Sequence, residues 1–136
     1  MTVNNLNVQF VNPSTISQPV GYSHLVEVSN AKMIYISGQV ALDQNGNLVG
    51  KGDMRAQAQQ VFANLKAALE EVGADFNNVV KLNFYLLDIS QVQAIREVRD
   101  QYVNTQHPPT STAVEVRRLF REDILIEVEA VAALPA

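Results

Sequence analysis

The sequence has no cysteine and only two histidines among its 136 residues. Without a thiol it has no disulfide, no thiolate metal site and no cysteine nucleophile, and this absence fits a reducing compartment such as the cytoplasm. Dedicated zinc or iron centres draw several of their ligands from histidine and cysteine. With two histidines and no cysteine, this chain cannot supply several such ligands. We therefore expect no metal, no other cofactor and a cytoplasmic location.

Positive charge and long apolar runs are also scarce. The chain has 10 lysines and arginines against 14 aspartates and glutamates, giving a net charge of −4. Nucleic acids are bound by basic surfaces, so this balance argues against a nucleic-acid partner. No run approaches the length of a membrane span, and the N-terminus lacks the charged-then-apolar pattern of a signal peptide. The expected partners are a small molecule and further copies of the chain.

Motifs for phosphate binding and for serine nucleophiles are missing as well. Gly46, Gly50 and Gly52 match neither a P-loop nor a dinucleotide fingerprint. Ser37 and Ser111 lie in no nucleophile-elbow context and have no evident His–Asp partner. The sequence therefore excludes a serine hydrolase.

The amino-acid composition is that of one globular domain. Hydrophobic residues make up 47% of the chain and charged residues 18%, as in ordinary folded proteins. We expect a single domain over residues 1–136, in which residues 1–20 form a loop-rich N-terminal arm.

Hydrophobic periodicity predicts the first elements. His24–Val28 and Met33–Ser37 alternate in polarity and are predicted as a hairpin pair of strands joined by turn-forming residues. Apolar residues then recur every three to four positions, which predicts a helix. Asp53 is its expected N-cap and Gly73 its expected stop.

The second half repeats the alternation. A strand is predicted at Val79–Leu87, and a helix follows with Ser90 and Gln93 at capping-box spacing. His107 ends this region, because a residue that precedes proline avoids the helical conformation. Two alternating runs near the C-terminus, Ala113–Val116 and Ile126–Val131, are predicted to pair as strands.

These elements indicate an α+β fold. Each helix has a single apolar stripe, so both helices must bury it against one face of the same sheet. The other face then stays partly uncovered, and apolar side chains there favour association with another copy.

An ordered set of short motifs carries a family resemblance from about residue 21 onward. The motifs are Ser37-Gly38-Gln39, Ala56-Gln57-Ala58, Asn64, Lys66-Ala67, Gly73, Val80-Lys81, Asp88, Val114-Glu115-Val116, Glu127 and Glu129. Together they resemble the reactive intermediate deaminases, the RidA (YjgF) family. The resemblance implies a chorismate-mutase-like fold, one mixed sheet with two helices on one face. It further implies a homotrimer whose subunit interfaces hold clefts that hydrolyse 2-imino acids to 2-keto acids and ammonia.

One position departs from the family pattern. The resemblance places Ser111 where the deaminases carry an arginine that holds the substrate carboxylate. A guanidinium can donate two parallel charge-assisted hydrogen bonds, whereas a hydroxyl offers one neutral donor. We expect carboxylate binding at this point to weaken by about 1–3 kcal/mol. The alternative is that Ser111 is only a loop or strand residue.

A second departure lies in the predicted second helix. Arg96 occupies the place of an asparagine that lines the cleft in many deaminases. One interpretation is that Arg96 supplies the anion-binding guanidinium from a different wall of the cleft. The other is a solvated helix residue that pairs with Asp100 at i+4.

Three further residues are candidates by resemblance. Glu127 falls at the position of the carboxylate that orients the attacking water, a group needed because water loses a proton as nitrogen gains one. Its alternative is an outward strand residue, of the same parity as Glu129, which is a candidate for structural hydrogen bonds. Tyr22 and His24 lie near the family's cleft tyrosine, but the alignment there shifts by one or two residues. Whether Tyr22, His24 or neither takes the place of that tyrosine stays open. His24 is either a proton shuttle or a hydrogen-bonded strand residue.

A small basic cluster remains. Arg117, Arg118 and Arg121 are candidates for binding an anion or RNA, since some members of the family are described as endoribonucleases. Acidic residues are interleaved with them, which favours a solvated turn between strands.

Two classes of function stay open. The first is a RidA-like hydrolase of an imine, enamine or related metabolite, with specificity altered by Ser111. The second is a non-catalytic trimer that binds a small metabolite, either a carboxylate or a nitrogen-containing compound.

Overall fold

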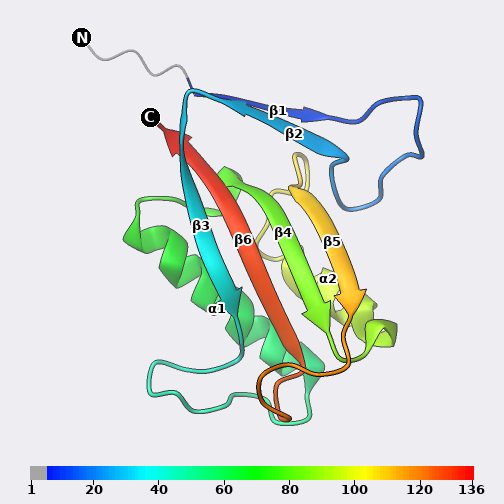
Figure 1. The fold of residues 1–136 in the computed structure, drawn as a ribbon, viewed down its shortest axis with the longest axis vertical. Helices are drawn as coiled ribbons and strands as arrows, with labels where there is room; N and C mark the ends of the chain where they lie inside the picture. The colour runs from blue at the N-terminus through cyan, green and yellow to red at the C-terminus, as the bar shows by residue number, and fades with distance from the viewer. Residues whose placement is uncertain (1–5) are drawn as a thin grey trace.

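The computed structural model describes residues 6–136, so residues 1–5 of the predicted arm lie outside it. Four strands form one mixed sheet in the order β3-β6-β4-β5 (Figure 1). They are β3 (Ala31–Gln39), β6 (Ile126–Pro135), β4 (Val79–Leu86) and β5 (Thr110–Glu115). Strand β6 is antiparallel to both of its neighbours, whereas β5 runs parallel to β4.

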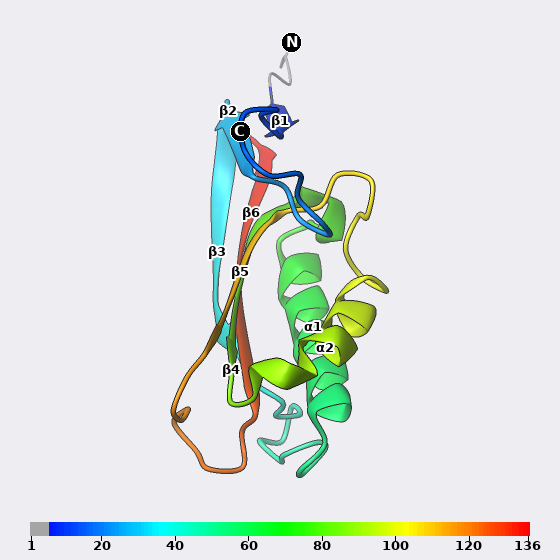
Figure 2. The ribbon, with the colours of Figure 1, turned by 90° about the vertical axis from the view of Figure 1, so that its right-hand side faces the viewer.

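Two helices cover one face of this sheet (Figure 2). They are α1 (Met54–Glu71) and α2 (Val92–Arg99), and short 3-10 turns precede β4 and α2 at η1 (Phe76–Asn78) and η2 (Ile89–Gln91). The prediction of one mixed sheet with two helices on one face is confirmed. No helix within residues 6–136 is long and apolar enough to cross a membrane.

Local signals define α1 as predicted. The Asp53 side chain caps the helix by accepting a hydrogen bond of 3.0 Å from the Ala56 backbone N–H. Gly73 ends it with a φ of 76°, a conformation that favours glycine. The apolar stripe of α1 is buried against the sheet, except that Val72 at the C-cap is exposed.

The start of α2 differs from the prediction. The capping side chain is Asp88, which accepts a hydrogen bond of 3.0 Å from the Ser90 N–H and opens η2. Gln91 at the N-cap of α2 makes no side-chain cap. The predicted capping box between Ser90 and Gln93 was therefore wrong, because the chain enters α2 through a 3-10 turn that Asp88 already caps.

Both predicted strand pairings were wrong. Strand β4 lies between β5 and β6, because α2 forms a crossover that returns the chain parallel to β4. The strand β2 (Leu25–Ser29) pairs with β1 (Asn7–Val11), and only Asn30 separates it from β3. One residue is too short for a tight hairpin, which needs at least two.

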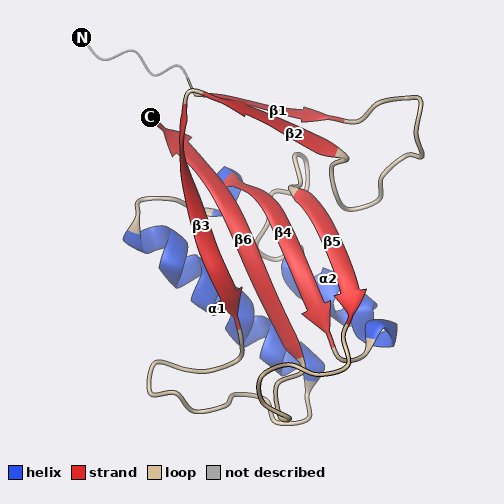
Figure 3. Cartoon of the chain, in the orientation of Figure 1, coloured by secondary structure: helices blue, strands red, loops and turns tan. Residues whose placement is uncertain are grey.

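Within residues 1–20, which were predicted as a loop-rich arm, the structure contains the strand β1. The β1–β2 pair lies across one end of the main sheet, as the red arrows of Figure 3 show. The long connection between these two strands, residues 12–24, returns towards β5.

The face of the sheet opposite the helices has no covering element among residues 6–136 (Figure 2). Tyr35 of β3 stands on this face with 77% of its surface exposed. Met33 and Val114 are also exposed apolar residues. Below, we call the side of the sheet away from the helices the open face.

Candidate functional site

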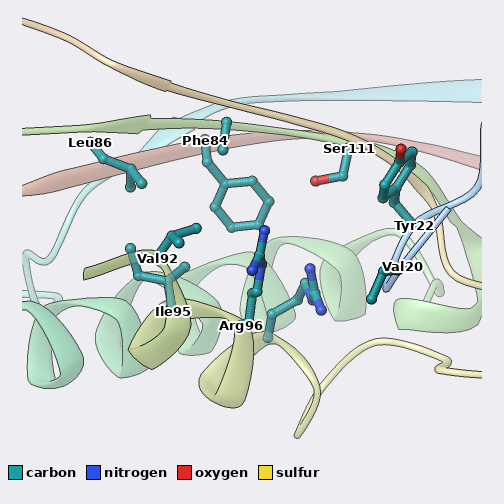
Figure 4. A pocket seen from close by; sticks show the side chains of 10 residues that line it. Val20, Tyr22, Phe84, Leu86, Val92, Ile95, Arg96 and Ser111 are labelled. Atoms are coloured by element: carbon teal, nitrogen blue, oxygen red, sulfur yellow. The ribbon is translucent and has the colours of Figure 1, made fainter. Parts of the chain in front are cut away.

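A pocket of about 220 Å³ lies between α2, strands β4 and β5, and the connection that follows β1 (Figure 4). Ten residues line it: Val20, Tyr22, Phe84, Leu86, Val92, Ile95, Arg96, Arg99, Ser111 and Ala113. Below, we call it the α2 pocket. It brings together three of the predicted site residues, Tyr22, Arg96 and Ser111.

The sheet supplies one wall of the α2 pocket through strand alternation. Strands β4 and β5 are paired in parallel, with Leu82 opposite Ser111 and Phe84 opposite Ala113. Side chains of alternate residues point to the same face, so these residues all face the helices. Ser111 is therefore a wall residue of the pocket, and it lies among apolar neighbours.

The helix supplies the opposite wall through its own period. Val92, Ile95, Arg96 and Arg99 occur at positions i, i+3, i+4 and i+7 of α2, which form one stripe. Arg99 is buried on this stripe, whereas Arg96 is exposed and lines the pocket from its edge. Sequence reasoning missed Arg99, although its spacing from Val92 was the available signal.

A buried serine fixes the third wall. Ser23 is 1% exposed, and its hydroxyl donates a hydrogen bond of 2.6 Å to the Pro108 carbonyl. Its backbone N–H donates to the Pro109 carbonyl at 3.2 Å. These bonds tie the connection that carries Val20 and Tyr22 to the segment just before β5, and so keep both residues at the pocket.

Arg99 is the most buried charged side chain of the pocket. The residue is 8% exposed, and its Nε donates to the Asp100 carboxylate at 2.9 Å. A Cβ at Gly21 would lie 2.8 Å from Arg99 Nη2, and Gly21 has a φ of 79°. Glycine at this position therefore leaves the room that the guanidinium occupies.

Arg96 faces the pocket without a protein partner. Its side chain makes no hydrogen bond or ion pair with any residue of the described chain, and Asp100 pairs with Arg99 instead. Of the alternative considered for Arg96, the exposed position on the helix is found and the ion pair with Asp100 is not. Figure 4 shows the Arg96 side chain reaching from α2 towards the ring of Phe84. None of the described lining residues is acidic, so the pocket is positively charged.

Glu127 does not line the α2 pocket. It lies opposite Tyr85 in the β4–β6 register, and the buried residues Ile126 and Val128 on either side of it face the helices. Glu127 therefore stands on the open face. Its carboxylate occupies the space that a Cβ at Gly38 would take.

Glu129 shares that face and makes the structural hydrogen bonds considered for it. Its carboxylate accepts from Asn83 Nδ2 at 3.0 Å and from the Tyr85 hydroxyl at 2.7 Å. The hydrogen bond from Asn83, followed by that from Tyr85, lowers the pKa of Glu129 below its usual value. The same bond to Glu129 raises the pKa of Tyr85, because the carboxylate stabilises the protonated phenol.

His24 also lies outside the α2 pocket. Its Nε2 is 2.5 Å from the Ser17 carbonyl oxygen, a distance that calls for a proton on Nε2. Its ring packs edge-to-face against Tyr22, with centroids 5.4 Å apart. These contacts agree with a hydrogen-bonded histidine that supports Tyr22.

The predicted basic cluster contains an internal ion pair. Arg121 binds Asp123 through two hydrogen bonds, of 3.0 Å from Nε and 2.7 Å from Nη2. Arg117 and Arg118 are exposed in the same turn. This arrangement agrees with a solvated turn between β5 and β6.

The chemistry available in the α2 pocket is the binding of a small anion with an apolar part. Two guanidinium groups, a serine hydroxyl and a tyrosine face a wall of aliphatic and aromatic side chains. Across residues 6–136, no three histidine, aspartate or glutamate side chains gather to hold a metal ion. A volume near 220 Å³ lies below the range of roughly 300–1,000 Å³ typical of pockets for drug-sized ligands, so it suits a small metabolite.

Comparisons with known proteins agree with this fold. The family model described as Endoribonuclease L-PSP matches residues 14–134. A RutC family protein of Pyrococcus abyssi is 40% identical over 116 residues, covering 85% of this chain and 88% of the relative. A Dermatophagoides farinae protein named 2-iminobutanoate/2-iminopropanoate deaminase is 34% identical over 118 residues, covering 86% and 89%. A solved structure of a Rid family protein of unknown function from Yersinia pestis has a TM-score of 0.84 at 36% identity, covering 94% of this chain and 99% of that one. The chain therefore belongs to the RidA (YjgF) family.

Proposed function

We propose that the protein hydrolyses the C=N bond of a small imine, or of the imine tautomer of an enamine, that bears a carboxylate. The observation that carries this proposal is the unpaired guanidinium of Arg96, which lines the same pocket as Ser111. Arg96 takes over the carboxylate-binding role that Ser111 cannot fill, because a guanidinium binds a carboxylate through two charge-assisted hydrogen bonds. The relative named as an iminobutanoate and iminopropanoate deaminase supports the reaction class.

The reaction needs a general base, and Glu127 is the candidate by resemblance. Within one chain it stands on the open face, whereas the α2 pocket lies on the helix side of the sheet. A base must come within hydrogen-bond reach of the water it activates, directly or through one further water. We therefore propose that Glu127 of the partner subunit completes the pocket in a homotrimer. The uncovered open face, with Tyr35 exposed, supports such an assembly.

The proposed steps use these groups in sequence. Arg96 and Ser111 hold the substrate carboxylate, and Tyr22 closes the pocket beside it. The substrate enters as the protonated imine, and the Glu127 carboxylate takes a proton from water as the water oxygen attacks the iminium carbon, which forms a neutral carbinolamine. Glu127 then gives this proton to the carbinolamine nitrogen and takes the hydroxyl proton as the carbonyl forms and ammonia leaves. The last proton passes to the departing ammonia as ammonium, so Glu127 returns to its ionised state.

A coupled assay tests this proposal. An amino-acid oxidase generates imines, and the release of keto acid is followed with and without the protein. We expect acceleration that Glu127→Gln abolishes, whereas the control Glu71→Gln, an exposed site at the end of α1, keeps it.

The second candidate is a metabolite-binding trimer without catalysis. It is favoured by Ser111 in place of the family arginine and by the absence of an acidic residue from the described lining of the pocket. Ligand binding with no acceleration across a broad panel of imines would select this function over the hydrolase.

A further inference from the structure

Arg99 has more hydrogen-bond donors than the protein uses. The residue is 8% exposed, and Asp100 accepts from its Nε. Its two Nη groups make no hydrogen bond with residues 6–136. Buried charges are normally paired and fully hydrogen-bonded, because taking them out of water is costly. Arg99 thus has two donor groups that no described residue uses and that are left for water or a ligand.

The unused donors of Arg99 are accessible, and Arg99 is a lining residue of the α2 pocket. No fully buried side-chain nitrogen or oxygen in the described part of the chain lacks a hydrogen-bond partner, so the Nη groups are not sealed in the core. Arg99 lines the pocket, and its Nη2 lies beneath Gly21, where a Cβ would stand 2.8 Å away. The free edge of the guanidinium therefore faces space that a ligand can enter.

Arg96 adds a second positive charge to the same small space. The two arginines lie three positions apart on one stripe of α2, and the described lining residues include no acid to offset them. Asp100, which offsets part of the Arg99 charge, has a half-exposed side chain outside the pocket. Like charges repel, and the repulsion is relieved when an anionic group binds each of them.

We propose that the α2 pocket takes a dicarboxylate: a short-chain 2-imino acid, or its 2-keto product, with a second carboxylate at the far end. Arg96 and Ser111 hold the carboxylate next to the reacting carbon, and Arg99 holds the distal one beside Gly21. Phe84 and Ile95 contact the methylene groups between them. The assignment to Arg96 rests on the proposed function, whereas the Arg99 subsite rests on its own burial and unused donors.

Calorimetric titration with two keto acids of equal length tests this substrate class. 2-Oxoglutarate and 2-oxopentanoate differ only in a distal carboxylate against a methyl group. We expect the protein to bind 2-oxoglutarate at least about tenfold more tightly, the scale of one charge-assisted hydrogen-bonded contact. Equal affinity for the two acids would overturn the inference, and so would tighter binding of inorganic phosphate than of 2-oxoglutarate.

Substitutions of Arg99 test whether this residue is the source of the preference for 2-oxoglutarate over 2-oxopentanoate. Arg99→Gln should lower 2-oxoglutarate affinity about tenfold and 2-oxopentanoate affinity much less. Arg99→Lys, which keeps the charge next to Asp100 and is safer for folding, should lose part of the preference because it lacks the planar fork. The control Arg118→Gln removes the same charge from an exposed turn and should leave both affinities unchanged. A preference that survives both Arg99 variants would contradict the subsite.

The titration separates this inference from the hydrolase proposal, because binding needs no turnover. A dicarboxylate preference without any imine hydrolysis would support the Arg99 subsite and reject the hydrolase. Hydrolysis confined to monocarboxylate imines would support the hydrolase and reject the subsite.

Discussion

Ser23 donates a hydrogen bond of 2.6 Å to the carbonyl of Pro108, a residue 85 positions further along the chain. This bond and the Ser23 N–H bond to Pro109 join the connection after β1 to the segment that begins β5. Tyr22 stands on one side of this junction and Ser111 on the other, and both line the α2 pocket. The junction therefore sets the distance between two walls of the site.

Replacing Ser23 with alanine should loosen these walls. The change leaves the Pro108 carbonyl without its partner, and a buried group left unsatisfied costs about 1–3 kcal/mol. We expect the free energy of unfolding, measured by urea denaturation, to fall by that amount, and affinity for 2-keto acids to fall with it. Ser14→Ala, at an exposed site in the same connection, is the matched control and should change neither quantity. Unchanged ligand affinity in Ser23→Ala would show that the junction does not shape the pocket.

The sequence predicted those features of the fold that residues close together in the chain determine. The Asp53 cap, the Gly73 stop and the apolar stripe between them were sufficient for α1, because each acts within a few residues. Strand neighbours were mispredicted, since adjacency in the sheet depends on the α2 crossover and on β1. Periodicity cannot report such long-range choices.

The same limit applies to the site. Ser111, Arg96 and Tyr22 were named because they fall at or near positions that line the cleft in the family, and the structure places all three in one pocket. Arg99 and Ser23 were missed because their importance arises from burial and from partners distant in the chain. An arginine on an inward helical stripe is the one local sign that would have pointed to Arg99.

Glu129 should make the free energy of unfolding depend on pH in the acidic range. Hydrogen bonds from Asn83 and Tyr85 place the pKa of its folded-state carboxyl below the ordinary value of 4.5. The stabilisation is thus fully present above pH 4.5 and is lost as the pH falls through the folded-state pKa. We expect the free energy of unfolding to fall less between neutral pH and about pH 3 in Glu129→Gln than in the unmodified protein.

Other carboxylates with lowered pKa values, Asp88, Glu97 and Asp123, are present in both proteins and cancel in this comparison. Glu71→Gln, which removes an exposed carboxylate at the end of α1, serves as the matched control. Identical pH profiles for Glu129→Gln and the unmodified protein would mean that the hydrogen bonds to Glu129 do not stabilise its charged form.

Tyr35 should be required for assembly. It is 77% exposed on the open face, where an aspartate would place a charge in the interface that we propose between subunits. We expect light scattering to show the proposed trimer for the unmodified protein and monomers for Tyr35→Asp. It should also abolish imine hydrolysis while the fold, followed by circular dichroism, persists. Val72→Asp, at an apolar site that is 41% exposed at the end of α1, should stay trimeric. A trimeric Tyr35→Asp would place the interface elsewhere.

Gly38 should be required for turnover because Glu127 uses the space beside it. A Cβ at Gly38 would collide with the Glu127 side chain from its Cγ to its Oε2, so Gly38→Ala must displace the carboxylate. Gly38 is not among the positive-φ glycines, and alanine should therefore be tolerated by the backbone. A positioned general base contributes about a hundredfold or more to rate, so we expect kcat for imine hydrolysis to fall by at least that factor.

The control for this last change is Gly46→Ala. Nothing lies within 4 Å of a Cβ at Gly46, although its φ of 79° strains an alanine backbone. It should lose some stability and keep full turnover, which separates strain from displacement of Glu127. If Gly38→Ala retained full turnover, Glu127 would either tolerate the displacement or take no part in catalysis. Comparison with Glu127→Gln decides between the two, because only in the first case does Glu127→Gln remain inactive.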